Sequence, residues 1–319
     1  MIAFVVRRVV GAIPLLLFVS FVSYALMGLA PGGPAAIFAE QARAMSPSAR
    51  AAFVASLGLD KPWYVQYLFW LKELLLHGSL GSSYVDGRPV VLRIAEKMPV
   101  TLELIGLSLL VTLAIAIPLG VAAATRRNGA FDVGITALAF VAYGIPVFWL
   151  GIVLVDVFAV QLRWFPASGI ASLGHAGDPL DRLWHLALPV ATLSIVGFAS
   201  WMRYQRGAML DVLGQPFIRT ARSKGLAERA VIYRHALRNA LIPIVTLLGL
   251  SLPALVGGAY FVEYVFSVPG MGYLGLNAVF QRDYPTVMGI TLLSAVLVIA
   301  GNLLADVGYV LLDPRVRYE

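Results

Sequence analysis

The chain has 319 residues, of which 60% are hydrophobic and only 13% charged, and its mean hydropathy is +0.83. Such a composition excludes a water-soluble globular protein and predicts a polytopic membrane protein. The net charge of +7 is typical of Lys/Arg-rich cytoplasmic loops, so we expect no nucleic-acid partner. The chain contains no cysteine, and its four histidines lack ligand spacing, so we expect no metal and no cofactor in it.

Hydrophobic runs long enough to cross a bilayer predict an all-α protein with six transmembrane helices. The first run could belong to a signal peptide, but it is longer than an h-region, so we interpret it as a retained helix. The predicted spans are residues 9–30, 101–125, 133–157, 186–203, 239–261 and 284–310.

The distribution of Lys and Arg predicts that both termini are cytoplasmic. Residues 203–238 hold eight basic residues against two acids, whereas 158–185 and 262–283, on the opposite side, are charge-balanced. The expected organisation is a first helix with an external helical segment (1–98), a five-helix core (99–311) with a loop at 204–238, and a cytoplasmic tail (312–319).

The segment between the first two spans predicts two short helices. Ser46 or Ser48 can cap the first, which would end at Gly58; Pro62 opens the second, which would run to about Leu76. The second helix places Trp63, Tyr67 and Trp70 near one face. This face suits either the lipid headgroups or a helical cap packed on the spans.

The basic loop predicts a helix–Gly–helix element. Pro216 suits the first turn of a helix that ends near Lys224, with Gly225 at the C′ position. A second helix would run from about Ala227 to Asn239, followed by re-entry into the membrane. Phe217, Ile218 and Ala221 would form an apolar strip opposite Arg219 and Arg222. The element could merely set topology, or it could dock as a short helix in the groove of a soluble partner.

"RTARSKG" followed by a helix and "NALIPI" resembles the EAA loop of ABC-importer permeases, which docks on the ATPase subunits. "RRVVGAIPLLLFVSF", "LGLDKPWYVQYLFWLKELLLHGSLGSSY", "HLALPVATL" and "FVEYVFSVPGMGYLGLNAVFQRDYPTVMG" resemble the B-type permease of dipeptide/oligopeptide importers, a type I permease fold. Arg219-Thr220-Ala221 stand where Glu-Ala-Ala would be, so Arg219 cannot take the glutamate's contact. The resemblance implies these ATPase-coupling residues: Phe217, Arg219, Thr220, Ala221, Arg222, Lys224, Gly225 and Leu226.

The resemblance implies a half-channel in the bacterial inner membrane. Its partners would be a second permease subunit, two ATPase subunits, a periplasmic or lipoprotein substrate-binding protein, and membrane lipid. The chain has no Gly-Lys dipeptide and hence no GxxxxGK[ST] phosphate loop, so ATP and Mg²⁺ would bind the partners, and we expect no catalytic residues here. Di- or oligopeptides are the leading substrates, with glutathione, nickel chelates or sugars as alternatives.

Polar residues in the predicted spans are few, which favours a transient conduit over a tight binding site. Glu103, Asp156 and Asp306 lie near span ends, where water is within reach, so a proton relay is hard to build. A secondary transporter and a non-transporting scaffold remain the alternative classes. The candidate pathway or gate residues are Tyr143, Thr246, Ser251, Glu263, Pro269 and Gly270.

Overall fold

The computed structural model describes residues 2–29, 46, 48, 61–175 and 177–312, and this part of the chain is almost entirely helical. Its only β-pairing is an isolated antiparallel bridge between Ser82 and Pro89. The chain divides into two compact units, one of residues 1–99 and 273–300 and the other of residues 100–272 and 301–319. The short helix predicted to end at Gly58 lies outside the described residues.

The first unit contains α1 (Ile2–Leu29), α4 (Trp63–His77), the start of α5 (Val90–Thr125), most of α12 (Met271–Phe280) and α13 (Tyr284–Leu312) as far as residue 300. Helix α4 begins after Pro62 and ends at Gly78, as the sequence predicts to within one or two residues.

The aromatic face of α4 packs against α1. Tyr67 is buried, its ring lies 5.5 Å from that of Phe21, and its hydroxyl lies 3.1 Å from Ser20 Oγ. Trp63 also contacts Phe21, and Trp70 lies 6.1 Å from Tyr67 in a stacked arrangement. These contacts favour the helical cap over an aromatic face turned toward headgroups.

A buried carboxylate holds the loop before α5 in this unit. Asp283 accepts hydrogen bonds from Ser83 Oγ (2.6 Å), the Tyr84 N–H (2.9 Å), Arg93 Nη1 (2.7 Å) and Thr286 Oγ1 (2.7 Å). Its side chain is 1% exposed. Because four groups donate to this carboxylate and one of them is the charged Arg93, the cost of burying it is compensated.

The second unit is a helical bundle that continues into the basic loop. Apolar side chains of α5, α6, α8 and α11 form its core, where Ala116, Ala139, Trp201 and Ile244 belong to one buried cluster. Its elements are the rest of α5, then α6 (Ala130–Gly144), α7 (Val147–Leu154), the π-helix η2 (Val155–Gln161), α8 (Pro179–Leu213), α9 (Pro216–Ser223), α10 (Glu228–Ala230), the π-helix η3 (Val231–Ala236) and α11 (Leu237–Val265).

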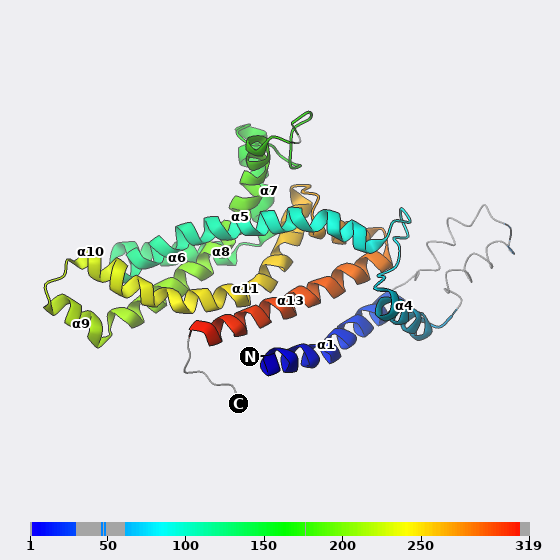
Figure 1. Cartoon of the computed structure of the whole chain (residues 1–319). Helices are drawn as coiled ribbons and strands as arrows, with labels where there is room; N and C mark the ends of the chain where they lie inside the picture. The colour runs from blue at the N-terminus through cyan, green and yellow to red at the C-terminus, as the bar shows by residue number, and fades with distance from the viewer. Residues whose placement is uncertain (1, 30–45, 47, 49–60, 176, 313–319) are drawn as a thin grey trace. The chain divides into compact units, whose positions relative to one another are not determined.

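The span predicted at 133–157 is not one straight helix, and whether its two parts cross the membrane as one span stays a prediction. Helix α6 ends at Gly144, and α7 begins after Pro146, turned by 100° relative to α6. Proline has no N–H to donate and restricts the residue before it, so Ile145 is extended and the helix breaks. Figure 1 shows α7 running in a different direction from α5 and α6, and its residues Leu150 and Gly151 are buried where it packs on α8 and α11.

Four described helices are long and apolar enough to cross a membrane, or five if α6 and α7–η2 together form one span. They are α1, α5, α8 and α13, and both α5 and α8 are much longer than the spans predicted within them. Helix α11 covers the predicted span 239–261. The count of six spans therefore stays a prediction, while the helical membrane architecture is confirmed.

Candidate functional site

Helix α9 begins and ends as its sequence predicts. Gln215 is extended, with φ −72° and ψ 149°, and Pro216 occupies the first helical turn. The helix ends at Lys224, and Gly225 has φ +73°. A Cβ at this position would meet nothing within 4 Å, so the positive φ is what requires glycine there.

Two side chains anchor α9 to the second unit. Ile218 is fully buried and Ala221 nearly so, whereas Phe217 is 43% exposed. The predicted strip of three apolar residues is thus wrong at Phe217, because neighbouring residues differ by about 100° around a helix. The buried residues that surround the two anchors are Val121 and Ala124 of α5, Met209 of α8, Val231 and Ala236 of η3, and Ala240 of α11.

The opposite face of α9 is polar and exposed. Arg222 donates two hydrogen bonds to the Glu228 carboxylate, at 3.1 and 2.6 Å, which closes the loop between α9 and α10. The hydrogen bond from Arg222 lowers the pKa of Glu228. Within the described chain, Arg219 and Lys224 form no ion pair and remain available to a partner. The exposed coupling candidates are Phe217, Arg219, Thr220, Arg222, Lys224, Gly225 and Leu226.

The helix after Gly225 runs directly into α11. Ala227 is the residue before α10, and helical conformation continues through η3 to Val265. The second helix, predicted to run from about Ala227 to Asn239, does not end there: α10, η3 and α11 form one continuous helical segment. The π turn in η3 widens the helix locally, a feature that often occurs at functional sites.

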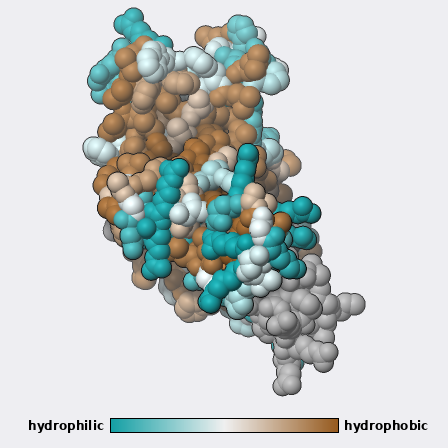
Figure 2. Space-filling model, turned by 90° about the vertical axis from the view of Figure 1, so that its left-hand side faces the viewer, coloured by the Kyte–Doolittle hydropathy of each residue, from teal (hydrophilic) through white to brown (hydrophobic). Residues whose placement is uncertain are grey.

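The α9–α10 element lies at one end of the second unit, beyond the ends of α5, α6, α8 and α11 (Figure 1). Figure 2 looks at this end and shows hydrophilic side chains gathered on the face toward the viewer. The outer surface is thus suited to contact water or a polar partner, while the anchors Ile218 and Ala221 are buried beneath it.

Glu263, a candidate gate residue, is buried at the end of α11 and organises the turn into α12. Its carboxylate accepts hydrogen bonds from Thr101 Oγ1 (2.6 Å) and from the Gly272 N–H (2.7 Å). Thr101 Oγ1 in turn accepts the Met271 N–H at 2.8 Å. A Cβ on Gly270 would lie 2.4 Å from Glu263 Oε2, so only glycine lets the chain pass so close.

The other gate candidates do not join this cluster. Tyr143 is 61% exposed, and its ring lies 5.3 Å from the Arg203 guanidinium, in a cation–π arrangement. Pro269 lies in the turn beside Gly270, partly buried. Thr246 and Ser251 are on α11, but their side chains lie outside the described set.

Two ion pairs join helices that are far apart in the sequence, and they were not predicted from it. Asp132 of α6 is buried and accepts from Arg206 Nε (2.6 Å) and Nη2 (2.7 Å) of α8. Glu103 of α5 accepts a bidentate interaction from Arg182 of α8, with Nε 2.8 Å from both oxygens. The second pair gives Glu103, one of the charges near the predicted span ends, a structural role.

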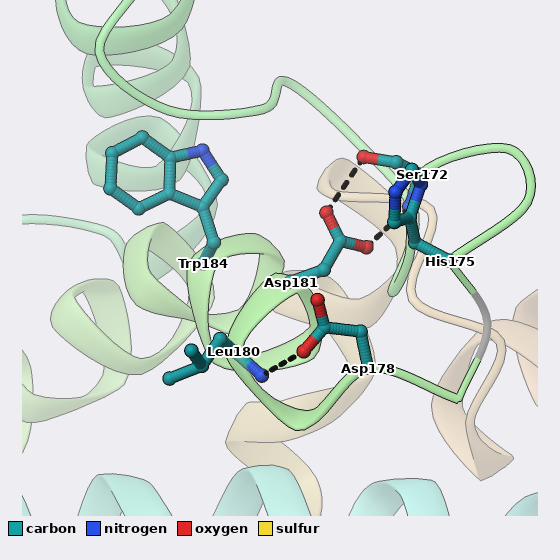
Figure 3. Close-up of a pocket in the computed structure, with 6 residues that line it drawn as sticks. All are labelled: Ser172, His175, Asp178, Leu180, Asp181 and Trp184. Atoms are coloured by element: carbon teal, nitrogen blue, oxygen red, sulfur yellow. Dashed lines mark hydrogen bonds between the residues drawn. The ribbon is translucent and has the colours of Figure 1, made fainter.

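A pocket of about 420 Å³ lies at the start of α8 (Figure 3). Asp181 accepts from the Ser172 N–H and hydroxyl, at 2.6 and 2.7 Å, and Asp178 accepts the Leu180 N–H as the N-cap. These carboxylates stabilise the loop before α8. No group of three or more His, Cys, Asp or Glu among the described residues could hold a metal. The lining residues are Ser172, His175, Asp178, Leu180, Asp181 and Trp184.

A helical membrane bundle with a short basic helix packed at one end is the arrangement expected of a transport permease subunit. The chain belongs to the family described as "Binding-protein-dependent transport system inner membrane component", whose model matches residues 116–318. Residues 1–105 match the model for the N-terminal part of such membrane components. Membership of this family makes the chain a permease subunit and not an enzyme.

Curated relatives match over their whole length. The oligopeptide transport system permease protein AppB of Bacillus subtilis (strain 168) is 43% identical over 319 residues, covering 100% of both chains. The dipeptide transport system permease protein DppB of Escherichia coli (strain K12) is 36% identical, again covering 100% of each.

Solved structures share the fold. An inward-facing MetNI methionine ABC transporter matches with a TM-score of 0.58 and 18% identity, over 70% of this chain and 97% of that one. An amino acid ABC transporter crystallised with histidines matches with a TM-score of 0.51 and 15% identity, over 69% and 94%. The ABC-importer permease fold predicted from the sequence is therefore confirmed.

Proposed function

We propose that this chain forms half of the translocation pathway of an ATP-driven importer for di- or oligopeptides. A second permease subunit would complete the pathway, two ATPase subunits would bind ATP and Mg²⁺, and a binding protein would deliver the peptide. The peptide class is supported by the full-length relatives named for peptide transport. The α9 end would face the cytoplasm, since it holds the densest basic loop of the chain.

The observation that carries this proposal is the way α9 is held. Ile218 and Ala221 fix the helix to α5, α8, η3 and α11, while its exposed face presents Phe217 and Arg219. A short helix with buried anchors and an exposed aromatic–basic face is suited to dock in a groove on a soluble partner. A loop that merely set topology would need no such anchoring.

The proposed mechanism follows from this arrangement. Closure of the ATPase pair on ATP would displace α9, and the cluster around Ile218 would pass the displacement to α5, α8 and α11. Because α10, η3 and α11 are continuous, the force reaches the core through a helix and not through a flexible loop. The bundle would then alternate between inward-facing and outward-facing states.

The two alternative classes are less well supported. A secondary transporter commonly carries ionisable residues at mid-membrane, but Asp132 and Glu103 are engaged in ion pairs with Arg206 and Arg182. A non-transporting scaffold would not need the ATPase-docking loop. Family membership also favours the importer.

The test is reconstitution of the purified complex in liposomes with its binding protein, followed by uptake of a labelled dipeptide. ATP inside the liposomes should drive uptake, while this chain alone under a proton or sodium gradient should transport nothing. Transport by the isolated chain would favour a secondary transporter. A chain that purifies without ATPase subunits and supports no uptake in any mixture would favour a scaffold.

A further inference from the structure

The core of the second unit consists of two buried clusters that follow each other along the helices. The bundle cluster contains Ala116 of α5 and Met202 of α8, and the α9 cluster contains Ala124 of α5 and Met209 of α8. One position on each helix falls between the clusters on the same helical face: Gly120 on α5 and Gln205 on α8. We call this pair the seam.

The two helices approach closely at the seam. A Cβ on Gly120 would lie 2.8 Å from Gln205 Cβ and 2.9 Å from the Met202 carbonyl oxygen. Real side chains do not sit at such distances, so only glycine fits here. Small residues allow neighbouring helices in membranes to come this close.

Gln205 is fully buried, yet neither polar atom of its amide has a hydrogen-bond partner within the described structure. Other buried polar residues of α8 are satisfied. Thr192 Oγ1 donates to the Leu188 carbonyl at 2.8 Å, and Ser194 Oγ donates to the Ser108 carbonyl at 3.0 Å. An unpaired buried amide is rare and destabilising, and an apolar side chain of the same shape would avoid that cost.

We propose that Gln205 is a positioning residue whose amide forms hydrogen bonds only in the other state of the transport cycle. In the present state, the seam between the α9 cluster and the bundle cluster contains the Gln205 amide without a hydrogen-bond partner. When α9 moves, α8 shifts along α5 at Gly120, and the Gln205 amide reaches backbone or side-chain groups that stabilise the shifted arrangement. The inference rests on the proposed importer function, because it needs a partner that moves α9.

Gln205→Met tests this, since methionine is also unbranched, of similar length and a good helix former. In the complete complex, the variant should unfold at the same temperature as wild type or higher, because a buried unpaired amide is removed. Dipeptide uptake per ATP hydrolysed should fall by about fivefold or more, the lower end of typical allosteric couplings. Gln205→Leu provides a second apolar variant if methionine fails to assemble.

The control is Thr192→Val, which also removes a buried polar group from α8. The Thr192 hydroxyl donates to the Leu188 carbonyl of the same helix, so its hydrogen bond does not depend on how α8 packs against α5. It should leave uptake per ATP unchanged. A direct readout is available because the chain has no cysteine. Spin labels at Ala137→Cys on α6 and Arg229→Cys on α10 should change their separation on ATP binding in wild type and remain at the nucleotide-free distance in Gln205→Met.

Three results would overturn the inference. A lower unfolding temperature in both apolar variants would show that the amide stabilises the present state. If Gln205→Met took up as much dipeptide per ATP as wild type, the amide would have no role in the cycle. The same would hold if ATP binding changed the distance between the labels in Gln205→Met as much as in wild type. A wild-type complex without ATP-dependent uptake would instead overturn the proposed function and the inference together, which separates the two failures.

Discussion

Ile218→Ala should detach α9 from the second unit without unfolding the bundle. Ile218 is fully buried, and it and Ala221 are the only buried side chains of this eight-residue helix. Truncating a buried isoleucine to alanine costs about 2–5 kcal/mol, from lost apolar burial and the cavity left behind. Because so few contacts hold α9, most of this loss should appear as local opening.

The cost converts into an opening equilibrium. At 1.4 kcal/mol per factor of ten, the open population of α9 should rise by about 30-fold to several thousand-fold. Amide hydrogen exchange of residues 216–224, measured in the assembled complex, should accelerate accordingly. Exchange in α5, α8 and α11 should change much less. Uptake per ATP hydrolysed should fall, because a detached helix transmits no force.

Phe217→Ala is the matched control, since Phe217 is adjacent but exposed. It should leave exchange in α9 nearly unchanged and weaken binding of the ATPase subunits. If Ile218→Ala left the exchange of α9 at the wild-type rate, the buried anchor would not hold the helix. If exchange rose but coupling stayed intact, docking through α9 would not carry the force.

Three further predictions concern the buried carboxylates of Asp283 and Glu263 and the ion pair between Arg222 and Glu228. Asp283→Ala removes the acceptor of Ser83, the Tyr84 N–H and Thr286, while Arg93 keeps Asp86 as a second charge partner at 3.4 Å. It should lower the free energy of unfolding by about 1–3 kcal/mol, measured by chemical denaturation. Gly270→Ala should cost about 1–3 kcal/mol in the same assay, because its Cβ would displace the Glu263 carboxylate. Arg222→Gln should raise the pKa of Glu228 toward its ordinary value near 4.3, measured by NMR. Since this pKa is lowered in the folded loop, the pair stabilises the loop above about pH 4.3 and is lost as pH falls through the folded pKa.

Matched controls separate these effects from general damage. Asp211→Ala removes an exposed carboxylate and should be nearly neutral. Gly134→Ala adds a Cβ that meets nothing within 4 Å on a helix, so it should be neutral or slightly stabilising. Equal losses in Asp211→Ala and Asp283→Ala, or in the two glycine variants, would contradict the argument. If Arg222→Gln left the pKa of Glu228 unchanged, the ion pair would not be what lowers that pKa.

Local signals predicted local structure well. Pro216 and Gly225 mark the two ends of α9, because proline fixes φ near the helical value and glycine adopts a positive φ without steric cost. The common face of Trp63 and Tyr67 was also readable, since helical periodicity fixes which side chains lie together. Which surface that face would meet was not readable, because α1 is far away in sequence.

Features that depend on distant parts of the chain could not be predicted. Arg206 and Asp132 are 74 residues apart, and no pattern within either helix indicates the pairing. Proline at position 146 is locally unfavourable for a continuous helix, but a turn of 100° depends on what α7 packs against. Phe217 was misplaced because an apolar residue was assumed to be buried, although exposed apolar residues are common at docking surfaces.

The unbroken helical path from Glu228 to Val265 has a mechanical consequence. At 1.5 Å per residue its path is about 55 Å long, with the basic loop at one end and the buried carboxylate of Glu263 at the other, and Figure 1 shows that α11 bends along this path. A tilt of about 5° would swing the far end by about 5 Å, enough to reposition the turn that follows it. A small displacement of the α9–α10 end can thus become a displacement of several ångströms at the end that carries Glu263.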